Sequence, residues 1–213
     1  MSNYRQLYSG LKPKEISYSK EDNVLIVRSN NFPVSDPKKA FVEALEEFPV
    51  TNTFHTYNTG TKVHIDCIIG DEVSFGCNCT IGGAGFGYDK DENGHNKRIP
   101  HLGDVVVQDY VTIHNSVNID RGTTGSTIIG KYTAIDSLVH IGHNAQIGSN
   151  CLISAGAVIG GSAEVGNNTF IGCNAFVKQK VKIGNNCTIG AGAVVTKDVP
   201  DDETWVGIPA KKI

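Results

Sequence analysis

The sequence predicts an all-β solenoid, a parallel β-helix of hexapeptide repeats, preceded by a small α/β region. Three observations predict this class: an aliphatic residue recurs every six residues, glycine often follows it, and the residue four places after it is usually small. A period of six fits neither the 3.6 residues of a helical turn nor the alternation of a strand, so each unit must be a short strand followed by a turn. Stacked units bury in one column the aliphatic residue that no single unit can bury.

The repeat covers most of the chain beyond residue 60. The aliphatic phase comprises Val105, Val111, Val117, Thr123, Ile129, Ile135, Ile141, Ile147, Ile153, Ile159, Val165, Ile171, Val177, Ile183, Ile189 and Val195, and it appears earlier at Val63, Ile69, Phe75 and Ile81. Three units close one triangular coil of 18 residues, and neighbouring strands lie about 4.8 Å apart. Residues 18 apart in sequence are therefore expected directly above one another.

The chain divides into three predicted segments: a small α/β region over 1–58, the β-helix over 59–200 and a C-terminal tail over 201–213. In the first segment, Asn23 to Arg28 is expected to form a strand. Asp36-Pro37 is expected to start a helix, because Asp caps helix N-termini and Pro suits the first helical position. The β-helix is interrupted over 83–103, where glycine, asparagine and proline predict a projecting loop.

Composition excludes several classes of protein. The formal charge of -3 and the scattered basic residues argue against nucleic-acid binding. No apolar run approaches the ~18 residues that cross a bilayer, and the first ten residues lack the pattern of a signal peptide, so a cytoplasmic protein without membrane insertion is expected. The cysteines form no C-x-x-C and no zinc spacing, and no metal is expected. Four of them occupy the small-residue position of the repeat, namely Cys67, Cys79, Cys151 and Cys187.

Three segments carry a more specific resemblance: GFGYDKDENGHNKRIPHLG, NIDRGTTGSTIIG and IDSLVHIGHNAQIG. Together they resemble the N-acyltransferase of lipid A synthesis that acylates a UDP-3-O-acylglucosamine, and VSDPKKAFVEALEEF resembles the end of that enzyme's uridine-binding domain. The resemblance covers roughly residues 33–166. It implies a left-handed β-helix, a homotrimer and transfer of an acyl group from a thioester to an amine.

The ending WVGIPAKKI instead resembles coenzyme A-dependent sugar acetyltransferases. The favoured expectation is therefore an acyl-CoA-dependent N-acyltransferase that moves acetyl or another short acyl group onto a nucleotide-linked amino sugar, for a surface polysaccharide or glycan. The alternative is the lipid A reaction itself, with a long acyl chain on acyl carrier protein. A non-catalytic β-helix scaffold and a γ-type carbonic anhydrase are further alternatives. The second needs H-x-x-x-x-H, whereas the residue five after His143 is Gly148.

The resemblance assigns the catalytic residues. His143 in IGHNAQIG matches the general base of the family, and an imidazole that titrates near neutrality can take the proton of an attacking amine. Gly161 lies 18 residues later, and in similar enzymes the backbone N–H one coil above the base binds the thioester oxygen. His140 and His114 are expected to be ordinary surface histidines.

The remaining expected site residues are substrate and coenzyme contacts. Asp120 and Asp136 are expected to contact sugar hydroxyls or to orient an imidazole. The loop is expected to line the acceptor end of the site, with Gly85 and Phe86 as substrate contacts. Lys197 and Lys211 are expected to meet the phosphates of coenzyme A.

Overall fold

A computed structural model describes residues 59–213 in full and the backbone of three strands before them. These strands are β1 (Ser17–Glu21), β2 (Val24–Arg28) and β3 (Phe54–Thr56). The chain forms two compact units, one made of residues 1–51 and 86–102 and the other of residues 52–85 and 103–213. In the first unit β1 and β2 pair antiparallel, which confirms the strand expected before residue 29. The helix expected from Asp36 lies outside the described residues.

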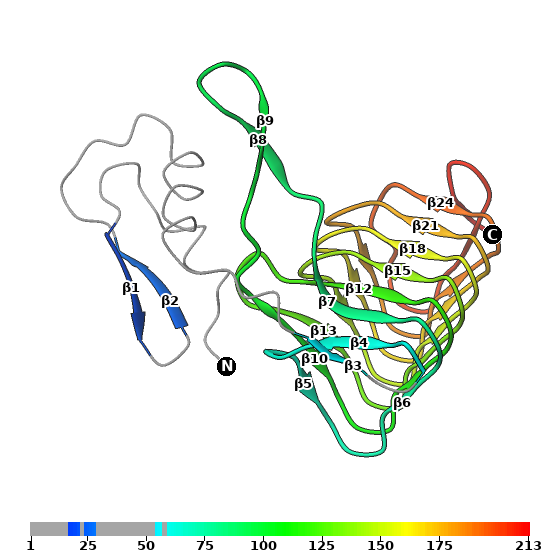
Figure 1. Ribbon diagram of the computed structural model, residues 1–213. Coiled ribbons are helices and arrows are strands. Elements are labelled where there is room, and N and C mark those ends of the chain that lie inside the picture. The colour runs from blue at the N-terminus through cyan, green and yellow to red at the C-terminus, as the bar shows by residue number, and fades with distance from the viewer. Residues whose placement is uncertain (1–16, 22–23, 29–53, 57–58) are drawn as a thin grey trace. The chain divides into compact units, whose positions relative to one another are not determined.

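The second unit is a parallel β-solenoid with three faces, each built from one strand per coil (Figure 1). Face 1 contains β5 (Ile68–Ile69), β10 (Asp104–Val107), β13 (Ser126–Ile129), β16 (Gln146–Ile147), β19 (Glu164–Val165) and β22 (Lys182–Ile183). Face 2 contains β6 (Ser74–Phe75), β11 (Thr112–Ile113), β14 (Ala134–Ile135), β17 (Leu152–Ile153), β20 (Phe170–Ile171), β23 (Thr188–Ile189), β25 (Thr204–Val206) and β26 (Lys211–Lys212). Face 3 contains β3, β4 (Lys62–His64), β7 (Thr80–Ala84), β12 (Asn118–Arg121), β15 (His140–Ile141), β18 (Val158–Ile159), β21 (Phe176–Val177) and β24 (Val194–Val195).

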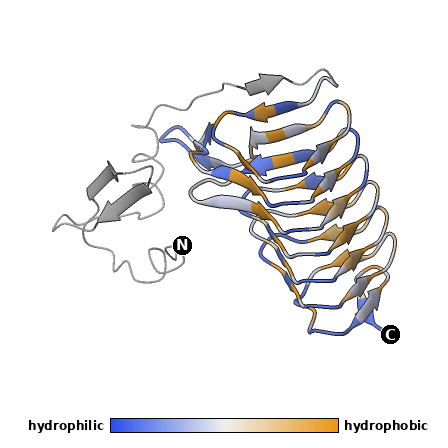
Figure 2. Ribbon diagram, turned by 90° about the horizontal axis from the view of Figure 1, so that it is seen from below, coloured by the Kyte–Doolittle hydropathy of each residue, from blue (hydrophilic) through white to orange (hydrophobic). Residues whose placement is uncertain are grey.

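The core is the column of aliphatic residues that the repeat predicts. The second residue of each two-residue strand from β14 to β24 points inward and is at most 3% exposed. Figure 2 shows hydrophobic residues recurring at the same place in successive coils. The fold class expected from the sequence is confirmed.

The small-residue position explains the buried cysteines. Buried threonines there donate to a carbonyl 15 residues ahead, as Thr133 Oγ1 does to Gly148 O at 2.9 Å. Cys151 Sγ makes the same contact with Gly166 O at 3.1 Å. Cysteine therefore substitutes for threonine as a small side chain with a weak donor. All six cysteines are free thiols.

The repeat phase expected before residue 126 is wrong by a four-residue insertion. Ile113 pairs with Ile135 and Ile119 with Ile141, a separation of 22 residues and not 18. Val111 and Val117 are buried in the small-residue position instead of the strand position. The extra residues form a wide turn between β12 and β13, where the sequence phase met Thr123.

The corner between faces 1 and 2 is held by an asparagine ladder. Asn150, Asn168 and Asn186 all have φ near +57°, which Asn tolerates better than most residues. Each Nδ2 donates to the Oδ1 of the next rung, at 2.9 Å from Asn150 to Asn168 and 3.2 Å from Asn168 to Asn186. Asparagine in this corner thus links successive coils.

The interrupting loop and the C-terminal residues each have regular structure. The loop contains the antiparallel hairpin of β8 (Tyr88–Lys90) and β9 (Asn96–Arg98), which belongs to the first unit. The residues after 200 continue the solenoid, since β25 extends face 2 and β26 folds back on β25. In the part of the chain that the structure describes, no helix is long and apolar enough to span a membrane.

Candidate active site

His143 lies at the corner where face 3 passes into face 1, two residues after the buried Ile141. The structure brings Gly161 directly over it. A β-carbon added to Gly161 would lie 2.7 Å from Nε2 and 3.0 Å from Cε1 of His143, so only glycine leaves room for the ring. The coils are also joined here by Ser162 N–H, which donates to His143 O at 2.8 Å.

The backbone N–H of Gly161 is available to a ligand. Among the described residues it donates no hydrogen bond, while Gly161 O accepts from Lys180 N at 3.0 Å. Its φ lies outside the left-handed region, so the backbone conformation does not require glycine. This corner therefore combines an imidazole with an uncommitted amide donor one coil away.

Asn144 is a site residue that the sequence analysis missed. Its Oδ1 lies 3.1 Å from His143 Nδ1 and accepts from Thr123 N at 2.9 Å. Its Nδ2 donates to Thr124 O at 2.7 Å, and its backbone N–H donates to Thr127 Oγ1 at 2.8 Å. The signal for this residue was present in the IGHN motif, but only the position of the inserted turn shows what its side chain contacts.

The inserted turn is packed tightly beneath Asn144. A β-carbon on Gly122 would lie 2.7 Å from Asn144 Nδ2 and 2.2 Å from Gly125 O. Thr127 Oγ1 donates to Asp120 O at 2.7 Å, which ties the end of the turn back to its start. The NIDRGTTGST segment thus forms a compact support for the residue beside the histidine.

Two of the expected polar residues pair with histidines. His140 Nε2 lies 3.6 Å from Asp120 Oδ2 on face 3, close in the chain to His143. His114 Nδ1 lies 3.5 Å from Asp136 Oδ1. Because this second pair follows strands of face 2, it lies at a different corner from His143. The structure therefore groups Asp120 with the candidate base and separates Asp136 from it.

The two expected coenzyme lysines lie on different parts of the solenoid. Lys197 is two coils beyond Gly161 in the same corner column, because 161 + 18 + 18 = 197 and β18, β21 and β24 pair with separations of 18. Gln179 occupies the intermediate position. Lys211 lies in β26, beyond the last coil of face 2.

Gly85 and Phe86 lie where the chain passes from the solenoid into the loop. Phe86 is 87% exposed and its ring centroid lies 4.9 Å from that of Tyr88. Their expected role as substrate contacts stays a prediction, as does the expectation that the loop lines the acceptor end of the site.

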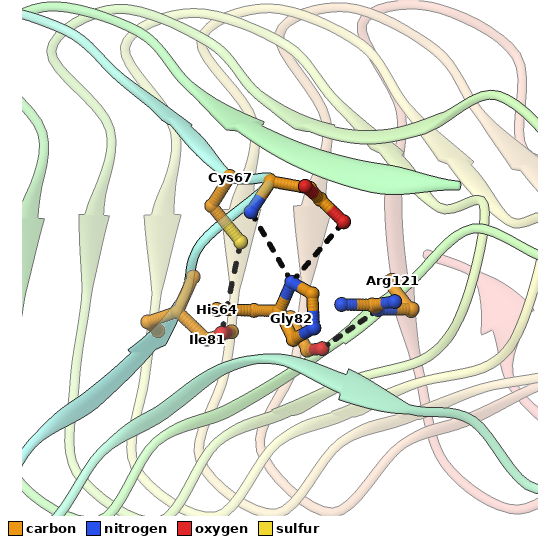
Figure 3. Close-up of polar contacts among 6 residues, drawn as sticks. His64, Cys67, Ile81, Gly82 and Arg121 are labelled. Atoms are coloured by element: carbon orange, nitrogen blue, oxygen red, sulfur yellow. Dashed lines mark hydrogen bonds and ion pairs between the residues drawn. The ribbon is translucent and has the colours of Figure 1, made fainter. Parts of the chain in front are cut away.

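A buried polar cluster lies in the early coils (Figure 3). Arg121 is 3% exposed and its Nε donates to Gly82 O at 2.9 Å, which holds the start of the interrupting loop. Burial lowers the pKa of its guanidinium. Burial also raises the pKa of the Cys67 thiol to about 11, and its Sγ donates to Ile81 O at 3.7 Å. This cluster anchors the base of the loop and leaves Cys67 protonated at neutral pH.

A cavity of about 600 Å³ lies over face 1, and Glu164, Lys182 and Asn185 help to line it. None of the site residues expected from the sequence lines it. Within residues 59–213 and the earlier described strands, no three His, Cys, Asp or Glu side chains form a group that could hold a metal ion.

The sequence matches a family model described as bacterial transferase hexapeptide (six repeats) over residues 126–161 and 162–197. A relative from Caulobacter vibrioides named UDP-3-O-acylglucosamine N-acyltransferase is 52% identical over 146 residues, which is 68% of this chain and 43% of the relative. One of the same name from Methylococcus capsulatus is 45% identical over 93 residues, 44% of this chain and 26% of the relative. The chain thus spans less than half the length of these curated relatives.

Solved structures show the same fold. The UDP-N-acetylglucosamine acyltransferase LpxA of Bacteroides fragilis aligns with a TM-score of 0.62 at 21% identity, over 72% of this chain and 58% of that chain. LpxA of Acinetobacter baumannii aligns with a TM-score of 0.55 at 23% identity, over 72% of this chain and 60% of that chain. At these identities the likeness establishes the left-handed β-helix and nothing about the reaction.

These comparisons correct one expectation from the sequence. A short-chain, acyl-CoA-dependent enzyme of surface polysaccharide synthesis is wrong, because the curated relatives are named UDP-3-O-acylglucosamine N-acyltransferases. That expectation rested on the ending WVGIPAKKI and its lysines. In the structure these residues close face 2, and Lys212 Nζ donates to Glu203 Oε1 at 2.7 Å. The ending is thus explained by the fold and carries no information about the acyl donor.

Proposed function

Because the chain belongs to the hexapeptide-repeat family, we propose that it is a UDP-3-O-acylglucosamine N-acyltransferase, which transfers an acyl group from a carrier-protein thioester to the sugar amine. The observation that carries this proposal is the stack of His143 on Gly161. It lies inside a repeat region that is similar to enzymes of that name. The stack places a proton acceptor and an oxyanion donor one coil apart, as acyl transfer requires.

The reaction follows from the two groups. As the amine nitrogen attacks the thioester carbon, the C–N bond forms and His143 Nε2 accepts a proton from the amine. The carbonyl oxygen becomes negative and is stabilised by the Gly161 N–H. The C–S bond then breaks, the carbonyl re-forms as an amide, and the imidazolium returns its proton to the leaving thiolate.

Lys197 is proposed to bind the phosphate at the far end of the donor's pantetheine arm. It lies two coils from Gly161, about 10 Å along the solenoid at the usual strand spacing. An ammonium is a suitable point charge for a phosphate. Lys211 is not included in this site, because it lies on face 2.

We also propose a homotrimer, and the outward side chains of the three faces support it. Leu152 and Phe170 on face 2 are 54% and 39% exposed, and Phe176 on face 3 is 40% exposed. Face 1 instead presents Glu164 and Lys182, which form an ion pair at 3.1 Å. Face 3 of one copy packing on face 2 of the next gives a closed ring. His143, at the outer edge of face 3, then lies in the cleft between two copies.

The experiment is an acyl-transfer assay on the purified chain with UDP-3-O-acylglucosamine as acceptor and hydroxymyristoyl-loaded acyl carrier protein as donor, with the product detected by mass spectrometry. An N-acylated nucleotide sugar is expected with this donor, and much slower transfer with acetyl-CoA. Product with acetyl-CoA alone contradicts the proposed donor. No N-acylation with either donor contradicts the proposed activity.

A further inference from the structure

The side chain of Asn144 has only one possible orientation. Its Nδ2 lies 2.7 Å from the carbonyl oxygen of Thr124, and its Oδ1 lies 2.9 Å from the backbone nitrogen of Thr123. A carbonyl oxygen can only accept a hydrogen bond and a backbone N–H can only donate one. Exchanging the two amide atoms would lose both bonds, so the backbone fixes Oδ1 as the atom facing His143.

This orientation determines where His143 carries its proton. Asn144 Oδ1 lies 3.1 Å from His143 Nδ1 and can only accept. Nδ1 must therefore bear the hydrogen, and the neutral ring has its lone pair on Nε2, the nitrogen that faces Gly161. We infer that Asn144 is a positioning residue that selects the Nδ1–H tautomer of His143 and aims Nε2 at the amine of the acceptor. This inference rests on the proposed role of His143 as the base.

The other corner asparagines show that Asn144 has a distinct use. Asn150 and Asn168 share its left-handed backbone, with φ of 57° and 56° against 60°, but each bonds to the next rung 18 residues later. The residue 18 after Asn144 is Ser162, so this corner has no such ladder. Asn144 reaches back to the inserted turn instead. The four extra residues of that coil thus supply the backbone groups that orient the amide.

Several charged or titratable groups lie on the elements packed around His143. In the coil before it are Asp120, which pairs with His140, and Arg121, which bonds to Gly82. Lys178 and Lys180 lie one coil beyond Gly161. All of these are unchanged in a substitution of Asn144, so a shift in the pH profile of that variant reports on the Asn144 contact.

The test compares the pH dependence of kcat/KM for the wild type, Asn144→Gly and Asn144→Asp. Glycine keeps the left-handed backbone and removes the amide. We expect kcat to fall about 10- to 100-fold, the range found for groups that orient metal-bound histidines, with the KM for donor little changed. Aspartate adds a negative charge beside the ring, which favours imidazolium. The acidic limb of the profile should move upward by about one pH unit.

The matched control is Asn150→Gly, which has the same residue type and backbone but lies in a different corner. It should retain the wild-type kcat and profile. A wild-type kcat in Asn144→Gly, an equal loss in Asn150→Gly, or an unmoved acidic limb in Asn144→Asp would overturn the inference. If Asn144→Gly does not fold, the limb of Asn144→Asp decides alone. Full activity in His143→Ala would instead overturn the proposed base, so the two failures are distinguishable.

Discussion

The imidazole of His143 and the α-carbon of Gly161 touch across one coil of the solenoid. No side chain fits between them, because a β-carbon at 161 would lie 2.7 Å from Nε2. The backbone of Gly161 is in an ordinary conformation, unlike that of Gly192 with φ of +66°. The glycine at 161 is thus required by the ring beneath it and not by its own turn.

The first prediction concerns this contact. Gly161→Ala should lower kcat by about 100-fold, because the methyl group displaces the imidazole and disturbs the amide that binds the oxyanion, a loss on the scale of removing one oxyanion donor. The measurement is steady-state acyl transfer, with thermal unfolding as a check on the fold. Gly192→Asn is the matched control, since asparagine accepts the left-handed backbone and no atom lies within 4 Å of its β-carbon. Equal activity in both variants would show that the contact has no catalytic role.

A second prediction concerns the six free thiols. Cys77 and Cys173 are exposed, whereas Cys79, Cys151 and Cys187 are buried. Cys67 is partly exposed, but its pKa is raised to about 11, so it is almost wholly in the unreactive thiol form at pH 8. Rapid alkylation of the native protein should therefore label two cysteines, and labelling of the other four should require denaturant. Fast labelling of Cys67, identified by peptide mapping, would contradict its placement in the buried cluster.

The third prediction tests the trimer through its apolar faces. Phe170→Glu places a charge on face 2 where we propose that face 3 of the next copy packs, and burying an unpaired carboxylate is strongly unfavourable. Sedimentation equilibrium should show a trimer for the wild type and monomer for this variant. Gln146→Glu adds the same charge on face 1 and should remain trimeric. A wild-type monomer would contradict the proposal, and so would a trimer that survives Phe170→Glu.

The repeat region could be read from the sequence because its information is local. Each coil repeats the same alternation of aliphatic, glycine and small residues, so the inward column from Ile129 to Val195 follows from spacing alone. The placement of Gly161 over His143 follows for the same reason, since both lie in coils of 18 residues. A regular spacing converts directly into contact.

The inserted turn could not be read in the same way. Val111 and Val117 are aliphatic, so they continue the strand phase even though they occupy the small-residue position. Only the pairing of Ile113 with Ile135 reveals the four extra residues. Because Asn144 is oriented by the backbone of that turn, its role was hidden together with the insertion.

The donor was mistaken for a different reason. Lysines near the end of the chain suggested a phosphate site, but their neighbours in space decide their role. Lys212 is bound to Glu203, whose pKa is lowered first by this hydrogen bond and then by the one from Trp205. Such a pairing across a hairpin depends on register and is invisible in the order of residues.

The most direct test of the central claim is the rate of acyl transfer from hydroxymyristoyl acyl carrier protein to UDP-3-O-acylglucosamine by His143→Ala. His114→Ala, a histidine at another corner, serves as the control. The account predicts a fall in kcat of about 10²-fold or more for His143→Ala, the scale of losing a general base, and near wild-type turnover for His114→Ala. Wild-type turnover in His143→Ala, with the fold intact, would contradict it.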